Sequence, residues 1–199
     1  PDLLGDLPDI FDRAGEPFAD TSLIPTYYLA RFARREVTVA LSGDGGDELF
    51  GGYETYVADR LHSALSKIPQ PLLSALSKVV TNFAPVTRNR VSLDYKLRQF
   101  LNNAHLDFRR AHWSWRTMFD ETGRRQILTR DWAEMAASED GFDVVNRRFD
   151  EVADAHPINQ AMYVDMKTWL ADNILVKVDR ATMAHSLESR APYLDHRLV

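Results

Sequence analysis

The sequence predicts an α/β domain that is mostly helical and contains one clear strand of the parallel type. The first observation is the apolar, partly β-branched run Val37–Leu41, which is typical of a strand buried on both faces. The second is the segment Ser42–Gly46, in which three of five residues are glycine, so that the backbone can turn sharply. The third is the helical spacing of apolar residues from Asp47 onward. This succession of strand, turn and helix places ligands at the carboxyl end of a strand.

Most of the remaining chain is predicted to be helical. A helix over Ser22–Arg35, capped by Asp20 or Thr21, leads directly into the strand and forms half of a βαβ unit. Residues 1–19 contain prolines and glycines and are predicted to be irregular. The other predicted helices cover residues 47–67, 71–81, 93–103, 105–117, 132–137, 142–153, 158–170 and 173–186, with a loop at 83–89, Asp172 as a cap and Asp195 capping a last helix.

Acidic residues dominate the turn and the helix that follows it. Asp44, Asp47 and Glu48 lie there, and no Lys or Arg occurs between Arg35 and Arg60. Bare phosphate would be repelled, whereas Mg2+ can bridge carboxylate and phosphate oxygens. For Glu48 an alternative stays open, because an acidic residue also stabilises the first turn of a helix through its dipole.

Two glycines, Gly51 and Gly52, fall inside the helix predicted over residues 47–67. Each should cost roughly 1 kcal/mol relative to Ala in a helix interior. Glycines at such a cost suggest that the helix packs closely against another backbone or a substrate.

Composition excludes several classes of function. The 199 residues contain 24 basic and 29 acidic side chains, a net charge of -5, without a long basic block, so we expect no nucleic-acid partner. No apolar run reaches the length of a membrane span, and no signal-like segment is seen, so we expect a cytoplasmic protein. Because the chain contains no cysteine, it holds no disulfide, no cysteine-ligated zinc and no cysteine nucleophile.

Two long stretches resemble signatures of the asparagine synthetase family, whose members are glutamine-dependent and use ATP. Residues 42–53, Ser-Gly-Asp-Gly-Gly-Asp-Glu-Leu-Phe-Gly-Gly-Tyr, resemble the second nucleotide-site motif of that family. Residues 172–195 resemble its late helical signature, which ends in Glu-x-Arg-x-Pro-hydrophobic-Leu-Asp. Two long motifs in the family's order are far more specific than one short glycine pattern.

The resemblance implies a PP-loop ATP pyrophosphatase-like domain, also called adenine nucleotide alpha hydrolase-like, of which residues 1–199 are a partial copy. The family's N-terminal glutaminase domain, its first phosphate loop Ser-Gly-Gly-x-Asp-Ser and its C-terminal end are absent from this sequence. We therefore expect this piece alone to be inactive. We also expect chain outside it, or self-association such as a homodimer, to cover its apolar edges.

The implied reaction is the ATP-dependent amidation of aspartate to asparagine, through a β-aspartyl-adenylate and with ammonia from glutamine. Asp44 matches the acidic residue that is important for forming the adenylate, although many relatives carry Glu there. Glu48 is predicted to bind the amino group of the substrate or a metal-bound water. The predicted site residues are the catalytic Asp44 and Glu48, the nucleotide-binding Ser42, Gly43, Gly45 and Gly46, and the Mg2+ ligand Asp47.

Three alternatives stay open. A related amidotransferase would act on another carboxylate, in a sugar, a peptide or a β-lactam precursor. A non-catalytic module would bind nucleotide only, and an unrelated helical interaction domain would do neither. Sequence preceding Pro1 separates the enzyme from the non-catalytic module, because only the enzyme requires the first phosphate loop.

Several further residues are assigned second rank. The resemblance places Asp20–Ser22 near the same site, with a plain helix cap as the alternative. A second group is predicted to form paired, partly buried ions that either shape the floor of the site or support the domain. Its members are Asp179, Arg180, Glu188 and Arg190. Structural roles are favoured for His185 and His196, and core packing for Phe108, Trp113, Trp115 and Phe119.

Overall fold

The computed structural model describes residues 2–65, 72, 100–101, 103–117, 119, 121–138 and 140–199. The chain divides into two compact units, residues 1–52 with 164–199 and residues 53–163. The loop predicted at 83–89, the helix at 71–81 apart from residue 72, and most of the helix at 93–103 lie outside the described residues. All seven predicted site residues belong to the first unit, so this unit carries the functional argument.

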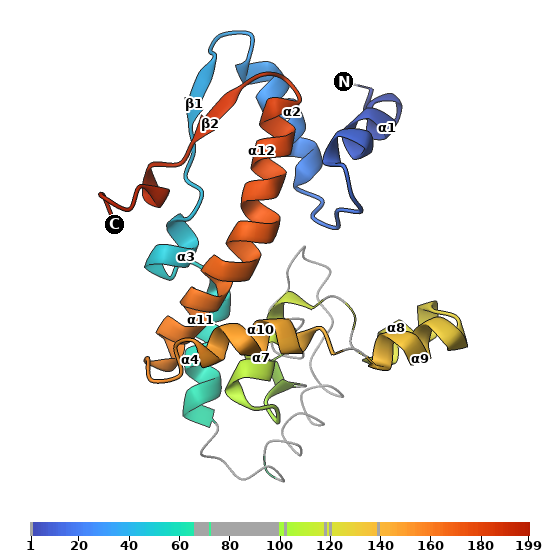
Figure 1. The fold of residues 1–199 in the computed structure, drawn as a ribbon, viewed down its shortest axis with the longest axis vertical. Helices are drawn as coiled ribbons and strands as arrows, with labels where there is room; N and C mark the ends of the chain where they lie inside the picture. The colour runs from blue at the N-terminus through green and yellow to red at the C-terminus, as the bar shows by residue number, and fades with distance from the viewer. Residues whose placement is uncertain are drawn as a thin grey trace. The chain divides into compact units, whose positions relative to one another are not determined.

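The first unit contains helices that lie beside a two-stranded parallel sheet (Figure 1). Helix α12 contacts α1, α2 and strand β2, and the short helix α3 contacts the π-helix η1. The elements of this unit are α1 (Leu3–Ala14), α2 (Leu23–Ala33), β1 (Val39–Leu41), α3 (Gly46–Phe50), η1 (Met166–Ile174), α12 (Leu175–Met183), β2 (Glu188–Arg190) and the 3-10 turn η2 (Pro192–Leu194).

The predicted strand forms, and its parallel type is confirmed, but it is shorter and more exposed than expected. Strand β1 begins at Val39 rather than Val37 and pairs with β2 in the register Val39 to Glu188 and Leu41 to Arg190. The prediction that it is buried on both faces is wrong here, since Val39 is 40% and Leu41 75% exposed. Side chains alternate along a strand, so Val39 and Leu41 share one face, and pairing with β2 covers an edge of β1 and not this face.

Residues 1–19 are not irregular, because α1 forms within them. The Asp2 side chain accepts a hydrogen bond from the Gly5 N–H at 3.2 Å, and Gly15 ends the helix with φ 73°. Pro8 removes one internal hydrogen bond, but tertiary contacts offset that loss. Ile10 and Ala14 are buried in a cluster with Leu23, Tyr27 and Ala181, which joins α1, α2 and α12. This burial overrides the weak local preference for helix.

The two helices predicted at 158–170 and 173–186 are one uninterrupted helical run. Helix α11 (Pro157–Asp165) continues into the π-helix η1 and then into α12. Asp172 therefore does not cap a new helix, which corrects the prediction. The Leu175 N–H donates to the Leu170 carbonyl, five residues earlier, so the chain accommodates extra residues without breaking. Segments of this kind occur frequently at functional sites.

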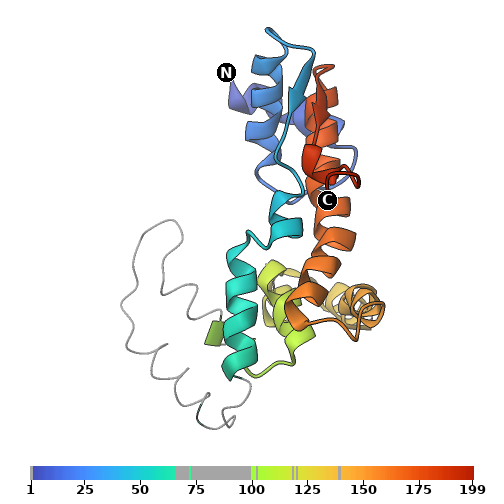
Figure 2. The same cartoon turned by 90° about the vertical axis from the view of Figure 1, so that its left-hand side faces the viewer.

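The second unit is helical in its described part. It contains α4 (Glu54–Leu65), α7 (Phe108–Arg116), α8 (Glu121–Ile127), α9 (Arg130–Ser138), α10 (Phe142–Asp150) and most of α11. Helix α7 contacts both α4 and α10, and Figure 2 shows α4 beside α7. Predictions at 105–117, 132–137 and 142–153 are confirmed by α7, α9 and α10, whereas α8 was not predicted.

A buried polar cluster holds α4 against α7. The Asp59 carboxylate is fully buried and accepts the Trp115 indole N–H at 2.8 Å. Its other oxygen lies 2.8 Å from Nδ1 of the equally buried His112. Trp115 is half-buried and also stacks on the buried Phe100 ring at 5.9 Å between centroids. Phe119 is 50% exposed, so its predicted core role is wrong for the described chain.

Within the described ranges, no helix combines the length and apolarity that a membrane crossing requires.

Candidate functional site

The acidic glycine turn follows β1 directly and is anchored by the neighbouring strand. The Ser42 N–H donates to the Arg190 carbonyl at 2.8 Å, which extends the pairing of β1 with β2 by one bond. The Gly46 N–H then donates to the Gly43 carbonyl at 3.1 Å and closes a tight turn. Gly45 has φ 85°, a left-handed conformation that L side chains rarely adopt. The sequence prediction of a sharp turn at the carboxyl end of the strand is confirmed.

The helix predicted over 47–67 is divided at the second glycine pair. Helix α3 has only five residues and ends at Gly51, whose φ is 69°, and α4 begins at Glu54. The glycines therefore do not lie inside a helix, and the cost expected there does not apply. Gly52 is closely packed, because a Cβ at this residue would overlap the Asp47 side chain and lie 3.2 Å from its Cα, but this contact is local and not with another element or a substrate.

The predicted site side chains differ strongly in exposure. Asp47 is exposed and Asp44 is half-buried, and neither carboxylate has a hydrogen bond or ion pair within the described part of the chain. Glu48 is only 1% exposed, although it belongs to the same short helix. A residue that only stabilises the first turn of a helix through the helix dipole does not need to be buried, so that role does not account for the burial of Glu48. The structure therefore separates Glu48 from the two accessible carboxylates.

The Ser42 side chain lies in the same turn as these carboxylates. Its Oγ is buried and has no hydrogen-bond partner among the described residues. Because an unpaired buried hydroxyl costs about 1–3 kcal/mol, a polar atom from outside these residues is expected to reach it. The hydroxyl belongs to the first residue after β1, where a parallel sheet binds ligands.

The carboxylates of the turn do not form a metal site from protein ligands alone within the described residues. Among the described residues, no group of three or more His, Asp and Glu side chains could hold a metal ion. Mg2+ at nucleotide sites is usually held by one or two carboxylates together with phosphate oxygens and water. The exposed Asp47, with the half-buried Asp44 three residues before it, is consistent with that mode.

The second predicted constellation is not brought together. Arg180 pairs with Glu16 at 2.9 Å and donates to the Ala14 carbonyl, so it binds the end of α1. Arg190 pairs with Glu188, another member of the predicted group, at 2.7 Å, but both side chains are more than half exposed and not partly buried. The Asp179 carboxylate forms no ion pair among the described residues. The predicted pairing is therefore confirmed for Glu188 and Arg190 only, and the four residues do not form one partly buried network because Arg180 binds the end of α1.

Sequence reasoning missed a polar cluster between α12 and the start of α2. The Lys177 ammonium donates to Asp20 Oδ2 and to Ser22 Oγ, each at 2.7 Å, and Lys177 is 8% exposed. Burial alone would raise the pKa of Asp20, but hydrogen bonds from Lys177 and Ser22 hold that pKa below its ordinary value. The available signal was a single lysine within the apolar run Ile174–Val178.

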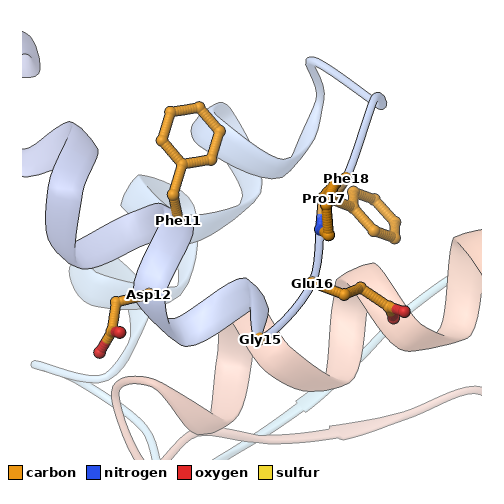
Figure 3. Close-up of a pocket in the computed structure, with 6 residues that line it drawn as sticks. All are labelled: Phe11, Asp12, Gly15, Glu16, Pro17 and Phe18. Atoms are coloured by element: carbon orange, nitrogen blue, oxygen red, sulfur yellow. The ribbon is translucent and has the colours of Figure 1, made fainter.

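A surface hollow lies elsewhere in the same unit, at the carboxyl end of α1 (Figure 3). Phe11 and Asp12 on the helix and Glu16–Phe18 on the following segment line it. The rings of Phe11 and Phe18 point in different directions, and none of the predicted site residues lines this hollow. The hollow therefore does not compete with the turn after β1 as the candidate site.

Comparisons with known proteins extend across the whole chain. The family profile described as asparagine synthase matches residues 1–199. The chain is 33% identical over 198 residues to asparagine synthetase [glutamine-hydrolyzing] 1 of Bacillus subtilis, covering 98% of this chain and 29% of that protein. It is 32% identical over 170 residues to a putative asparagine synthetase of Methanocaldococcus jannaschii, covering 84% and 30%.

A more distant relative has a different name. The chain is 25% identical over 172 residues to the amidase chry2 of Gibberella zeae, covering 82% of this chain and 25% of that protein. No solved structure matches the chain. The chain thus spans less than a third of the length of these curated relatives.

Proposed function

This chain belongs to the asparagine synthase family, and we propose that it forms the nucleotide-binding part of an ATP-dependent amidating enzyme. In this proposal the sheet of the first unit is part of a PP-loop type α/β domain. Its acidic turn after β1 binds ATP together with Mg2+. Residues outside positions 1–199 supply the first phosphate loop, the glutaminase centre and the remainder of the synthetase site.

The proposed chemistry has two steps. A carboxylate oxygen of aspartate attacks the α-phosphorus of ATP, forming an acyl-adenylate and releasing pyrophosphate. Ammonia from glutamine then attacks the acyl carbon, forming the amide and releasing AMP. The role of the protein is to position the reactants and stabilise developing charge, and bound Mg2+ would neutralise the departing pyrophosphate.

The residues of the turn have distinct proposed roles. Ser42 Oγ donates to the nucleotide, and Gly43 allows its close approach together with Gly45 and Gly46. Asp47, which is exposed, holds Mg2+. Asp44 supports formation of the adenylate with a side chain one methylene shorter than Glu. Glu48 acts from a buried position toward the amino group of the substrate or a metal-bound water.

The observation that carries this proposal is the buried, partnerless Ser42 hydroxyl next to two accessible carboxylates without protein partners. A buried hydroxyl normally finds a partner, and a helix-start carboxylate does not require a glycine turn.

Isotope exchange between pyrophosphate and ATP in the full-length protein tests the proposal. Exchange that depends on aspartate and Mg2+ is expected, because adenylate formation is reversible before ammonia attacks. Exchange with a sugar, peptide or β-lactam precursor instead of aspartate would support a related amidotransferase. ATP binding without exchange with any of these acceptors would contradict the enzyme and favour a non-catalytic nucleotide-binding module.

A further inference from the structure

We propose that Tyr193 and Leu194, in the 3-10 turn η2, are positioning residues that hold the acidic turn 42–47 in its binding conformation. This inference rests on the proposed function of that turn. It connects the two family-like stretches, which are far apart in sequence, through direct contacts. The contacts lie entirely within the first unit.

Leu194 occupies the space beside Gly45. A Cβ added to Gly45 would overlap the Leu194 side chain and lie 3.0 Å from its Cγ. Gly45 is also the residue whose φ of 85° turns the chain into α3. The side chain of Leu194 therefore packs against the backbone at the point where the turn is most sharply bent.

Tyr193 holds the next part of the turn. A Cβ on Gly46 would lie 3.3 Å from the Tyr193 ring, and the same ring meets Phe50 edge-on at 5.7 Å between centroids. Gly46 begins α3 and Phe50 is its last residue. One ring thus contacts both ends of the short helix, which is too short to be stable by itself.

The turn that carries these side chains is itself well anchored. Its strand, β2, pairs with β1, and the Arg190 carbonyl accepts the Ser42 N–H at 2.8 Å. Pro192 opens η2, and the Leu194 and Asp195 N–H groups donate to the carbonyls of Ala191 and Pro192 at 3.0 and 3.1 Å. The side chains that hold the acidic turn therefore have a defined position relative to β1.

The positions of the two accessible carboxylates depend on this arrangement. Asp44 and Asp47 flank Gly45–Gly46, and neither carboxylate is held by a protein hydrogen bond in the part of the chain that is described. Their location is set by the backbone between them. Contacts that hold this backbone consequently determine where the carboxylates meet a nucleotide and its cation.

Hydrogen–deuterium exchange of residues 42–52 in the full-length protein tests the contact directly. Leu194→Ala and Tyr193→Ala are expected to make these amides exchange about tenfold faster, because the turn opens more often. Tyr193→Phe keeps the ring and should restore slow exchange. Leu29→Ala is the matched control, since Leu29 is 66% exposed on α2 in the same unit. Unchanged exchange in both alanine variants would overturn the inference.

Kinetics on the same variants separate this inference from the proposed function. The KM for ATP in pyrophosphate exchange should rise about tenfold in Leu194→Ala, with a smaller change in kcat. If Leu194→Ala does not fold, Leu194→Val is expected to show the same effects at reduced size. Wild-type protein without pyrophosphate exchange would reject the proposed function. If the wild-type protein catalyses pyrophosphate exchange, an unchanged KM for ATP in folded Leu194→Ala and Tyr193→Ala would reject the positioning role alone.

Discussion

The ammonium of Lys177 lies 2.7 Å from the carboxylate of Asp20, across 157 residues of sequence. The Lys177 side chain is 10% and the Asp20 side chain 19% exposed, so the pair is largely shielded from water. Ser22 Oγ accepts a second hydrogen bond from the ammonium, and Asp20 Oδ1 accepts the Ser22 N–H at 2.8 Å. One side chain of α12 thus fixes the start of α2.

Removing the ammonium should leave a nearly buried carboxylate without its cation. We predict that Lys177→Met lowers the free energy of unfolding by about 2–4 kcal/mol, because a shielded charge loses its partner. Urea-induced unfolding of the full-length protein measures this change. The matched control is Arg130→Ala, whose ion pair with Glu134 is highly exposed and should contribute less than about 1 kcal/mol. Equal effects of the two substitutions would contradict the assigned burial.

The sequence predicted the helix before the strand, the strand and the glycine turn, because their signals are local. It did not predict β2, since Glu188–Arg190 has no strand-like composition and forms only by pairing with β1. It also missed α1, whose stability depends on burying Ile10 and Ala14 against distant helices. Local patterns do not contain such contacts.

The candidate site was also predictable only where its signal is local in the sequence. Residues 42–47 were identified from the turn chemistry and the acidic composition. The partners of Lys177 and Arg180 were not, because each cation binds a residue more than 150 positions away. The division of the following helix at Gly51 was missed because the apolar spacing continues across the break.

The indole of Trp115 supports the buried Asp59 carboxylate in the second unit. We predict that Trp115→Phe lowers the free energy of unfolding by about 1–3 kcal/mol, because one carboxylate oxygen loses its donor in a site without water access. Trp132 is 61% exposed, and Trp132→Phe should change stability by less than about 0.5 kcal/mol. Urea denaturation of both variants makes the comparison. A larger loss in the Trp132 variant would rule out the assigned core role.

His185 makes the stability of the first unit depend on pH. Burial, followed by the charges of Arg31 and Arg13, lowers the pKa of His185 below its ordinary value of 6.5, and Asp9 opposes this shift. The unfolded chain therefore binds the proton more readily than the folded chain. Stability should fall as pH drops through 6.5, and this loss should be complete below the folded pKa.

His185→Gln should remove that part of the pH dependence. Urea midpoints measured between about pH 8 and about pH 5.5 are expected to fall less steeply in this variant than in the wild-type protein. Every other residue is the same in both proteins, so the comparison isolates position 185. Parallel curves for the two proteins would show that His185 does not titrate differently on folding.

The proposed role of the acidic turn is tested most directly by pyrophosphate exchange in Asp44→Asn of the full-length protein. The account predicts that exchange falls about a hundredfold or more, because stabilisation of the adenylation step is lost. Glutamine hydrolysis should persist in this variant. As a control, Asp12→Asn changes an exposed acidic residue in the same unit and should leave the rate of pyrophosphate exchange unchanged. Pyrophosphate exchange at the wild-type rate in a folded Asp44→Asn variant would remove Asp44 from the mechanism and contradict the account.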